Sequence, residues 1–362
     1  MTKEGFALSL SAKDTGIIKG VAICLMLWHH LFSNALYSGG SSAVVFMAAV
    51  GKVCVSLFLL VSGYGLACQY SQLITDSKNL KERFFSTIKF IAKRYVKFYT
   101  GYWVIFLIFV LLGCVVMGVS LESRYETDNV MFPLVVDFFG FMGYHSYNIT
   151  WWFNRTILLL YFVFPILYLL ICKVPYISFT LCLALCLFPI PIAFVNEMTI
   201  WMFPFFIGMF WAMKIPQGCT ITNKRKYWLL LPIVLILCCG LVYFRQNRIV
   251  PYFTGITVDG LLALVFSLIV IILIRDLPIV NVVFSFLGRH SANVYMVHTF
   301  LFFYWFPQFI YAPKYAILIF LLLLSCSIGV SMILELIKEK SGIYDLSASI
   351  VKKIDMPWIK MI

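Results

Sequence analysis

The stretch IIKGVAICLMLWHHLFS, residues 17–33, decides the fold class of this chain. It is apolar over almost its whole length, and about 20 such residues are needed for a helix to cross the hydrocarbon core of a bilayer. Ionisable groups are costly at that depth, yet the stretch carries Lys19 near one end and the pair His29 and His30 near the other. We therefore predict a transmembrane helix whose polar residues have a function.

The whole chain has the composition of an integral membrane protein. Of its 362 residues 62% are hydrophobic and only 12% are charged, whereas a soluble domain has about 45–50% apolar residues. We predict an all-α polytopic membrane bundle of about ten transmembrane helices, which forms a single domain over residues 1–362. Its membrane core lies at about 12–340, and a cytoplasmic tail follows at about 341–362. The polar leader 1–14 lacks a small-residue cleavage site, so the first span is expected to be retained as an anchor.

Apolar runs of spanning length give the predicted helices. Prolines interrupt the fifth and sixth runs, which are therefore expected to be kinked or short. The run 131–144 is too short to span and carries Asp137, so it is expected to lie at the interface or to re-enter the membrane. The predicted spans lie at about 15–36, 44–66, 98–119, 153–172, 176–195, 199–214, 227–244, 255–274, 290–308 and 315–337.

Basic residues are distributed unevenly between alternate loops. With the N-terminus inside, 22 of the 28 Lys and Arg residues fall on the cytoplasmic side, which predicts that both chain ends are cytoplasmic. The longest polar loops are then 67–97 inside and 120–150 outside. The net charge of +13 reflects this bias and an attraction to anionic lipid, and it does not indicate nucleic-acid binding. The six basic residues on the outer side are Lys52, Arg124, Arg155, Arg245, Arg248 and Lys314.

Helical phase separates the two histidines of the first span. Lys19 and His30 are eleven residues apart, which at about 100° per residue comes within about 20° of three full turns. They therefore share one face, about 16 Å apart along the axis. His29 points about 80° away from Lys19, toward a neighbouring helix or the edge of the cavity. Alternatively, Lys19 snorkels to lipid head groups and His30 only bonds a carbonyl, but the pKa of histidine suits proton transfer near neutral pH.

Other polar side chains form smaller clusters. Ser291, Tyr295 and His298 recur at i, i+4 and i+7, so they line one face of the ninth predicted span. Ser62 and Gly63 close the second span, where close helix packing explains them better than chemistry does.

Three further features lie at the predicted membrane rims. Arg94 and Lys97 share a face at the cytoplasmic start of the third span. They are either ordinary flanking charges or part of an anion-binding site. The pair 151–152 at the outer start of the fourth span is Trp-Trp, which is typical of interfacial anchors. Arg155 and Asp259 lie at outer span ends and could pair with each other or contact a polar ligand.

These segments occur in the order found in a known family. The sequence resembles the membrane-bound acyltransferase 3 family of bacteria, whose first span carries a basic residue, ten intervening positions and a histidine, as in Lys19 and His30. Lysine stands at 19 and 97 where the family more often has arginine, which keeps the charge but loses bidentate phosphate geometry. The other matching segments are FLLVSGYGL at 58–66, Arg94-Tyr95-Val96-Lys97, Trp151-Trp152-Phe153, and the run from Ser291 to His298, with Ala292 where tyrosine is usual.

The resemblance implies O-acetylation in polysaccharide biosynthesis. An acyl group, usually acetyl, would move from cytoplasmic acetyl-CoA to a hydroxyl of a cell-surface or exopolysaccharide sugar, or of its lipid-linked precursor. His30 would be catalytic, as general base or as acyl carrier, and Lys19, Arg94 and Lys97 would bind the CoA phosphates, with no metal. The protein would be a multi-pass protein of the bacterial plasma membrane. We assign the substrate cavity to Ser62, Trp152, Arg155, Ser291, Tyr295 and His298.

A transporter or flippase of glycan or lipid precursors is the alternative function. It too would explain polar residues at membrane depth. Against it, the sequence has no evident inverted repeat and no acidic coupling pair in the membrane, since Asp259 stands alone near a rim. Dependence on CoA separates the two functions, because only the transferase would move label from acetyl-CoA to glycan.

Overall fold

The regular structure of this protein is almost entirely helical. The computed structural model describes residues 6–34, 36–37, 41–188, 192–215, 219–221, 224–246 and 252–356. Within these ranges the strands are β1 (Phe6–Ala7) and β2 (Thr220–Ile221), an antiparallel pair of two residues each. The predicted all-α membrane bundle is thus confirmed. Its helices are α1 (Ala12–Phe32), α2 (Ser42–Gly51), α3 (Cys54–Thr75), α4 (Leu80–Val115), α5 (Leu121–Tyr125), α6 (Met131–Phe138), η1 (Gly143–His145), η2 (Ile149–Trp151), α7 (Trp152–Lys173), α8 (Pro175–Leu187), α9 (Ala193–Lys214), α10 (Lys224–Gln246), α11 (Tyr252–Ile274), α12 (Pro278–Thr299), η3 (Phe300–Trp305), α13 (Pro307–Tyr311), α14 (Ala316–Lys340) and α15 (Ile343–Asp355).

Seven helical stretches in the described ranges are long and apolar enough to cross a membrane. The other three predicted spans are also helical, as α8, α9 and α12 with η3, but they are not among these seven. One is the short α8 of 13 residues, and α12 carries Arg289 and His290 in its interior. The seven stretches are Ala12–Phe32, Ser42–Thr75, Leu80–Val115, Ile149–Lys173, Leu229–Gln246, Thr257–Ile274 and Ala316–Lys340.

The fifth and sixth predicted spans, both of which contain proline, differ in length and continuity. The fifth run is short, because α8 ends at Leu187, ahead of Pro189. The sixth run is continuous, because α9 has 22 residues and passes through Pro204. Prolines are tolerated in membrane helices when neighbouring groups satisfy the freed carbonyl. Residues 35 and 189–191 of the predicted spans, and 357–362 of the predicted tail, lie outside the described residues.

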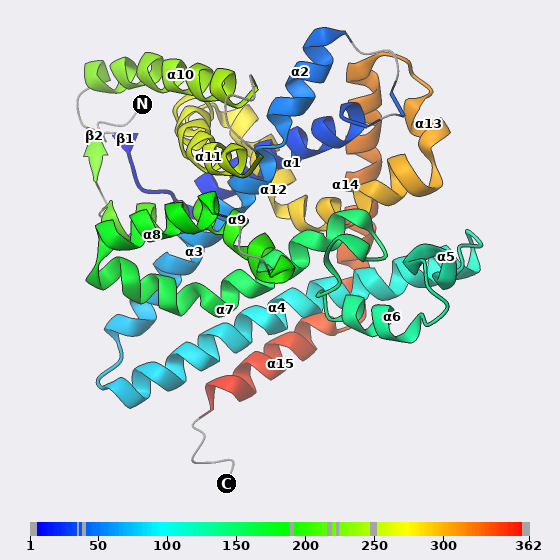
Figure 1. Cartoon of the computed structure of the whole chain (residues 1–362), viewed down its shortest axis with the longest axis horizontal. Coiled ribbons are helices and arrows are strands. Elements are labelled where there is room, and N and C mark those ends of the chain that lie inside the picture. Colours follow the sequence, from blue (N-terminus) through cyan, green and yellow to red (C-terminus); the bar gives the residue numbers. More distant parts are fainter. Residues whose placement is uncertain are drawn as a thin grey trace. The chain divides into compact units, whose positions relative to one another are not determined.

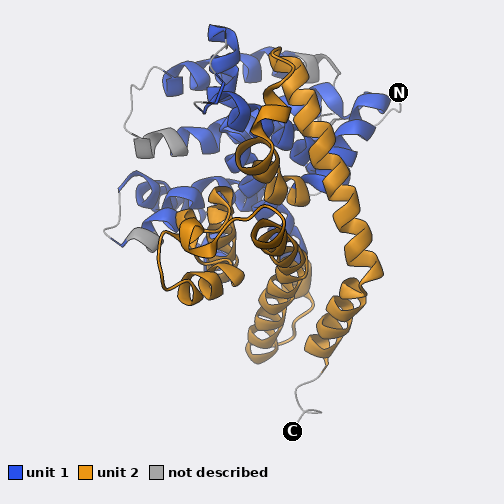
Figure 2. Cartoon of the chain, turned by 90° about the vertical axis from the view of Figure 1, so that its right-hand side faces the viewer, with its two compact units in different colours: residues 1–71, 164–291 blue, residues 72–163, 292–362 orange. Residues whose placement is uncertain are grey.

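The chain divides into two compact units, which Figure 2 colours separately. Unit 1 comprises residues 1–71 and 164–291, and unit 2 comprises residues 72–163 and 292–362. The boundaries fall inside α3, α7 and α12. The division does not test the prediction of a single domain, because each unit is built from two separated segments.

Helix backbones touch at glycines inside unit 1. A Cβ added to Gly20 of α1 would overlap the carbonyl oxygen of Phe284 on α12. A Cβ on Gly63 of α3 would overlap the carbonyl oxygen of Phe205 on α9. Small residues allow such close approach, which maximises van der Waals contact where lipid supplies no hydrophobic drive for helix association. The packing interpretation of Gly63 is confirmed.

The long cytoplasmic loop predicted at 67–97 is wrong, because this segment is helical. The helix α3 continues to Thr75, and α4 starts at Leu80, where the Asn79 side chain accepts from the Glu82 backbone N–H at 2.8 Å. With 36 residues α4 is about 54 Å long, well beyond the roughly 30 Å of the hydrocarbon core. It contacts α15, which runs alongside it in Figure 1, and the Lys93 ammonium pairs with the Asp355 carboxylate.

Candidate functional site

The start of α1 is held in place by a buried ion pair in unit 1. The Asp14 carboxylate accepts from the Ser11 backbone N–H at 2.8 Å, and the Ser11 hydroxyl in turn accepts from the Asp14 N–H, which forms a capping box. Arg275 binds the same carboxylate through two nitrogens, Nε at 2.8 Å and Nη2 at 2.9 Å. Its Nη1 also donates to the Ala7 carbonyl at 2.8 Å. The start of the helix that carries Lys19 is therefore fixed both by its own capping box and by Arg275.

Replacing Arg275 by glutamine is expected to destabilise unit 1 strongly. The Asp14 side chain is only 5% exposed, and removing one partner of a buried pair typically costs about 3–5 kcal/mol. Thermal unfolding in detergent should show a lowered midpoint, and the double variant Asp14→Asn/Arg275→Gln should recover part of the loss. Arg289→Gln removes an exposed arginine of the same unit and should leave the midpoint unchanged. An unchanged midpoint for Arg275→Gln would show that the ion pair does not contribute to the stability of the folded protein.

Lys19 is half-buried on α1, beside the contact between Gly20 and Phe284. It forms no ion pair or hydrogen bond with any residue in the described part of the chain. A partly buried ammonium without an internal anion is suited to bind an anionic group of a ligand, since charge-assisted hydrogen bonds are the strong ones.

The two histidines of α1 have different surroundings. The Nδ1–H of His29 donates to the Ala48 carbonyl on α2 at 2.7 Å, so His29 contacts a neighbouring helix, which is one of the two placements predicted from helical phase. At the same contact a Cβ on Gly51 of α2 would lie 2.6 Å from the Leu25 carbonyl oxygen. The half-buried His30 ring lies 5.2 Å from that of His29, at an interplanar angle of 55°. His29 is thus committed to the contact with α2, and His30 shares the face of Lys19.

Asp259 has a partner in unit 1, which corrects its description as an isolated carboxylate. It forms an ion pair with Arg245 of α10, whose Nη2 lies 3.3 Å from Oδ2. The same guanidinium donates through Nη1 to the Ala49 carbonyl at 2.8 Å. The pair joins α10, α11 and α2, so Asp259 does not need Arg155 or a ligand to balance its charge.

The predicted cavity serines of unit 1 differ in burial. Ser62 is half-buried next to Gly63 on α3. The hydroxyl of Ser291 is buried and donates to the Gly288 carbonyl at 2.8 Å, within α12. A serine that bonds back to its own helix in this way is as consistent with packing as with chemistry.

Two of the cations predicted to bind the acyl donor, Arg94 and Lys97, lie on the long helix α4 of unit 2. The guanidinium of Arg94 lies over the Phe90 ring, 4.9 Å from its centroid, and is half-buried. Lys97 is exposed and has no ion pair with any described residue. One turn earlier, Lys93 is engaged by Asp355. Lys97 is thus the lysine of this stretch that remains open to an anion.

The end of α12 is hydrogen-bonded to η2, which directly precedes α7. The Tyr295 hydroxyl donates to the Thr150 carbonyl, and the indole N–H of the buried Trp151 donates to the Met296 carbonyl at 3.0 Å. His298 is fully buried, with its Nδ1 bonded to the Tyr295 carbonyl at 2.9 Å and its ring stacked on Phe302. These contacts bring Tyr295 together with the Trp-Trp segment, whereas His298 packs against its own helix and Phe302.

The two tryptophans of that segment have different roles. Trp151 is 1% exposed, so its interpretation as an interfacial anchor is wrong. Trp152 is half-buried and stacks on the exposed Tyr144, with ring centroids 5.3 Å apart and an interplanar angle of 25°. Arg155 lies against Gly143, where any Cβ would overlap the guanidinium. Gly143 has a φ of +71°, a backbone conformation that also favours glycine.

A carboxylate outside the spanning helices forms a second polar centre in unit 2. Asp137 of α6 is 1% exposed, and it accepts from the Tyr147 backbone N–H and, at 3.0 Å, from the Tyr125 hydroxyl. The Tyr102 hydroxyl donates to the Asp137 carbonyl at 2.6 Å. Arg124 lies over the Tyr147 ring and partly offsets the carboxylate charge. The sequence marked Asp137 as out of place in an apolar run, but it gave no sign of the tyrosines that surround it.

Burial raises the pKa of Asp137 to about 7, despite the hydrogen bonds and Arg124, which act in the opposite direction. The folded protein therefore binds more protons than the unfolded chain between about pH 4 and pH 7. The free energy of unfolding is expected to fall by up to about 1.4 kcal/mol per pH unit as pH rises through this window, and to level off above it.

Melting midpoints measured from pH 5 to pH 8 check this expectation. The slope should disappear in Asp137→Asn and persist in Asp128→Asn, which changes an exposed aspartate of the same segment. A wild-type midpoint that rises from pH 5 to pH 7, or an unaltered slope in Asp137→Asn, would refute the assignment.

The predicted site residues are divided between the units. Lys19, His30, Ser62 and Ser291 belong to unit 1, and Arg94, Lys97, Trp152, Arg155, Tyr295 and His298 belong to unit 2. Among the described residues no group of three or more His, Cys, Asp or Glu could hold a metal ion.

Comparison with known proteins assigns the chain. A family model described as an acyltransferase domain, that of the acyltransferase 3 family, matches residues 16–336. No curated protein and no solved structure matched the chain. The match covers most of the 362 residues and includes α1 from Gly16 onward, with Lys19 and His30. The chain therefore belongs to the acyltransferase 3 family and is a membrane acyltransferase.

Proposed function

We propose that this acyltransferase moves an acetyl group from cytoplasmic acetyl-CoA to a hydroxyl of a cell-surface or exopolysaccharide sugar, or of its lipid-linked precursor, in the bacterial plasma membrane. One observation carries the proposal. Lys19, a half-buried cation without an anionic partner in the described chain, and His30, a titratable group, share a face of the continuous helix α1. This pairing suits an anionic donor that must deliver its reactive end deeper in the membrane.

The donor is held through its phosphates. Lys19, Arg94 and Lys97 are cations on the side of the membrane where the positive-inside rule places the cytoplasm. CoA carries its phosphates at one end and its thioester at the other, separated by a thin pantetheine arm. Binding of the phosphates at the rim therefore leaves the thioester free to extend along α1 toward His30.

Acetyl transfer needs one proton acceptor and one proton donor. In the direct route His30 takes the proton of the sugar hydroxyl, whose oxygen attacks the thioester carbonyl, and the CoA thiolate leaves and is then protonated. In the relay route the His30 imidazole itself attacks the thioester and expels the CoA thiolate. The sugar hydroxyl then attacks the acetyl-imidazole, takes the acetyl group and gives up its proton, and the CoA thiolate is protonated. Labelled acetyl-CoA supplied without acceptor separates the routes, because only the relay leaves label on the protein.

The acceptor is bound by the aromatic and polar groups of the predicted outer side. Trp152 with its stacked partner Tyr144, together with Arg155, offers a flat apolar surface next to a hydrogen-bond donor. Tyr295, His298, Ser62 and Ser291 would orient the reacting groups, as predicted from the sequence. The remaining partners are membrane lipids.

The test is transfer of label from radiolabelled acetyl-CoA to glycan in membranes that contain the full chain. A transferase gives labelled glycan, whereas a transporter or flippase moves precursor without CoA. Lys19→Gln is expected to raise KM for acetyl-CoA by roughly tenfold or more with a smaller change in kcat, because a charge-assisted hydrogen bond contributes about 1.5–3 kcal/mol. Lys13→Gln, which changes an exposed lysine of the same helix, is the control. Absence of labelled glycan from membranes with intact protein would rule out the proposal.

A further inference from the structure

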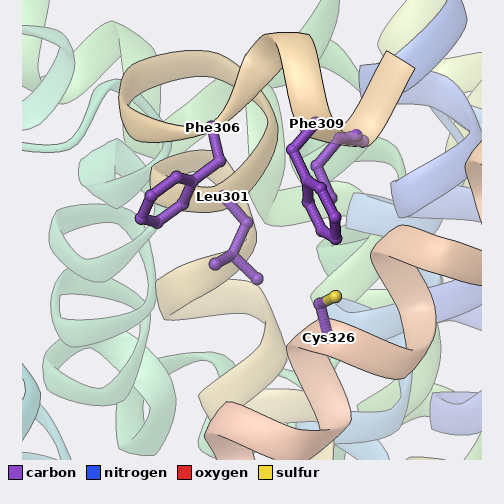
Figure 3. Close-up of a pocket in the computed structure, with 5 residues that line it drawn as sticks. Leu301, Phe306, Phe309 and Cys326 are labelled. Atoms are coloured by element: carbon purple, nitrogen blue, oxygen red, sulfur yellow. The ribbon is translucent and has the colours of Figure 1, made fainter. Parts of the chain in front are cut away.

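A cavity of about 210 Å³ lies in unit 2 between η3, α13 and α14 (Figure 3). Its lining is apolar apart from one thiol. Figure 3 shows Leu301, Phe309 and Cys326 of α14 around the space. The five lining residues are Leu301, Phe306, Phe309, Ile310 and Cys326.

The chain does not fill this space because its helix changes type here. After α12 the backbone forms the π-helical turns of η3, which are wider than α-helical turns. Pro307, which has no N–H, then begins α13, a helix of only five residues. The side chains of these short elements converge from one side, and the small Cys326 on α14 leaves the opposite side open.

The cavity opens at an exposed apolar surface, which we expect to face lipid. Phe309 is 57% exposed and Phe306 41%, and both belong to the lining. The outer turns of α14 are likewise exposed and apolar at Ile317, Leu318 and Leu321. Water would find no polar partners in such a space, and an empty space would lose dispersion contacts, so a hydrocarbon group suits it best.

The depth of the cavity matches one half of a bilayer. Cys326 comes ten residues after Ala316, the first residue of α14, which places it about 15 Å along the helix axis. Half of the hydrocarbon core is about 15 Å thick. A chain that starts at the head groups beside the first turn of α14 would therefore end at Cys326. In the predicted orientation this half is the outer leaflet.

A cation lies at the head-group end of this path. Lys314 is exposed two residues before α14, and it forms no ion pair with any residue that the structure describes. Its φ of +63° is uncommon for a residue other than glycine and fixes the loop between α13 and α14. Residues 304–315 include Tyr304, Trp305, Tyr311 and Tyr315, the residue types that gather at membrane interfaces.

We propose that this cavity binds one hydrocarbon chain of an outer-leaflet phospholipid, whose phosphate is bound by Lys314. The apolar lining, the opening at an exposed apolar surface, the depth of Cys326 and the cation at the interface all fit a single molecule of this chemistry. The site is separate from acetyl transfer, so its test has a readout that does not involve acetyl-CoA or glycan.

The experiment uses the full chain in nanodiscs that contain phosphatidylglycerol with a diazirine at the end of one acyl chain. Irradiation is expected to label peptides that contain Phe309 or Cys326. Filling the cavity with Cys326→Phe, or with the larger Cys326→Trp, should reduce this labelling at least tenfold. Leu336→Trp, at an exposed position of α14 outside the cavity, should leave it unchanged.

A second pair of variants tests the phosphate contact without touching the cavity. Lys314→Gln should reduce labelling by the phosphatidylglycerol probe several-fold but not labelling by a diacylglycerol probe with the same chains. Lys340→Gln, at the opposite end of α14, is the matched control. Equal labelling of wild type and Cys326→Phe would overturn the proposal, as would preferential displacement of the probe by a polyprenyl-phosphate sugar lipid.

Discussion

Replacing His30 by alanine is expected to abolish acetyl transfer while leaving the protein in the membrane. A positioned acid or base contributes about 10²–10⁴-fold to a rate, and loss of an acyl carrier would be at least as severe. His30 is half-buried and shares a face of α1 with Lys19, a cation that forms no ion pair with any described residue. The measurement is the initial rate of label transfer from acetyl-CoA to glycan, normalised to the amount of folded protein.

The adjacent histidine provides the matched control. The Nδ1–H of His29 donates to the Ala48 carbonyl, and the amide of asparagine can supply a donor at a similar position. His29→Asn should therefore retain most of the rate, whereas His30→Asn should not. Equal loss from both variants at equal protein levels would indicate that the pair is structural, and full activity of His30→Ala would exclude it as the catalytic residue.

Replacing Gly20 by alanine is expected to destabilise the folded protein strongly. A single methyl group at this position overlaps the backbone carbonyl of Phe284, and a backbone atom cannot move aside as a flexible side chain could. Overpacking of a well-packed site typically costs about 1–3 kcal/mol and occasionally more. Here α1 would have to separate from α12, so we expect a cost at the upper end of that range. Fluorescence-detected size-exclusion chromatography after heating gives the midpoint.

A second glycine of unit 1 separates the effect of steric overlap from the effect of helix propensity. A methyl group added to Gly65 on α3 would have no neighbouring atom within 4 Å, and alanine is a better helix former by about 1 kcal/mol. Gly65→Ala should therefore be neutral or slightly stabilising. If Gly20→Ala unfolds no earlier than Gly65→Ala, the close crossing of α1 and α12 would be refuted.

The features that the sequence could predict depend on composition and on the spacing of residues along a single helix. The membrane bundle follows from apolar runs, the contact of His29 with α2 follows from helical phase, and the close packing of Gly63 follows from its size. Each can be inferred from residues that are close together in the chain, because a helix fixes the direction of every side chain relative to its neighbours.

The features that the sequence could not predict depend on partners distant along the chain. Charge counting places Arg245 among the outer charges, but it pairs with Asp259 of another helix. The same counting makes Lys338 a cytoplasmic flanking charge, yet it is 3% exposed and its ammonium donates to the Asn293 side chain at 2.7 Å. Counting treats each lysine or arginine as facing solvent or head groups, so it cannot identify those that satisfy buried polar groups. The tyrosines around Asp137 escape prediction for the same reason.

The contacts between α6 and α4 bear on how far an acetyl group must travel. Phe138 and Phe139, at the end of α6, accept hydrogen bonds from Trp103 and Tyr99 of α4. Tyr99 is only five residues beyond Arg94, which is about 7.5 Å along the helix, compared with the roughly 30 Å of an unperturbed hydrocarbon core. If Arg94 lies at the cytoplasmic rim, as the sequence predicts, the outer segment is expected to re-enter the membrane, and the layer between the two sides is then expected to be thinner beside α4 than in the unperturbed bilayer. Donor and acceptor could then meet without either molecule crossing the membrane.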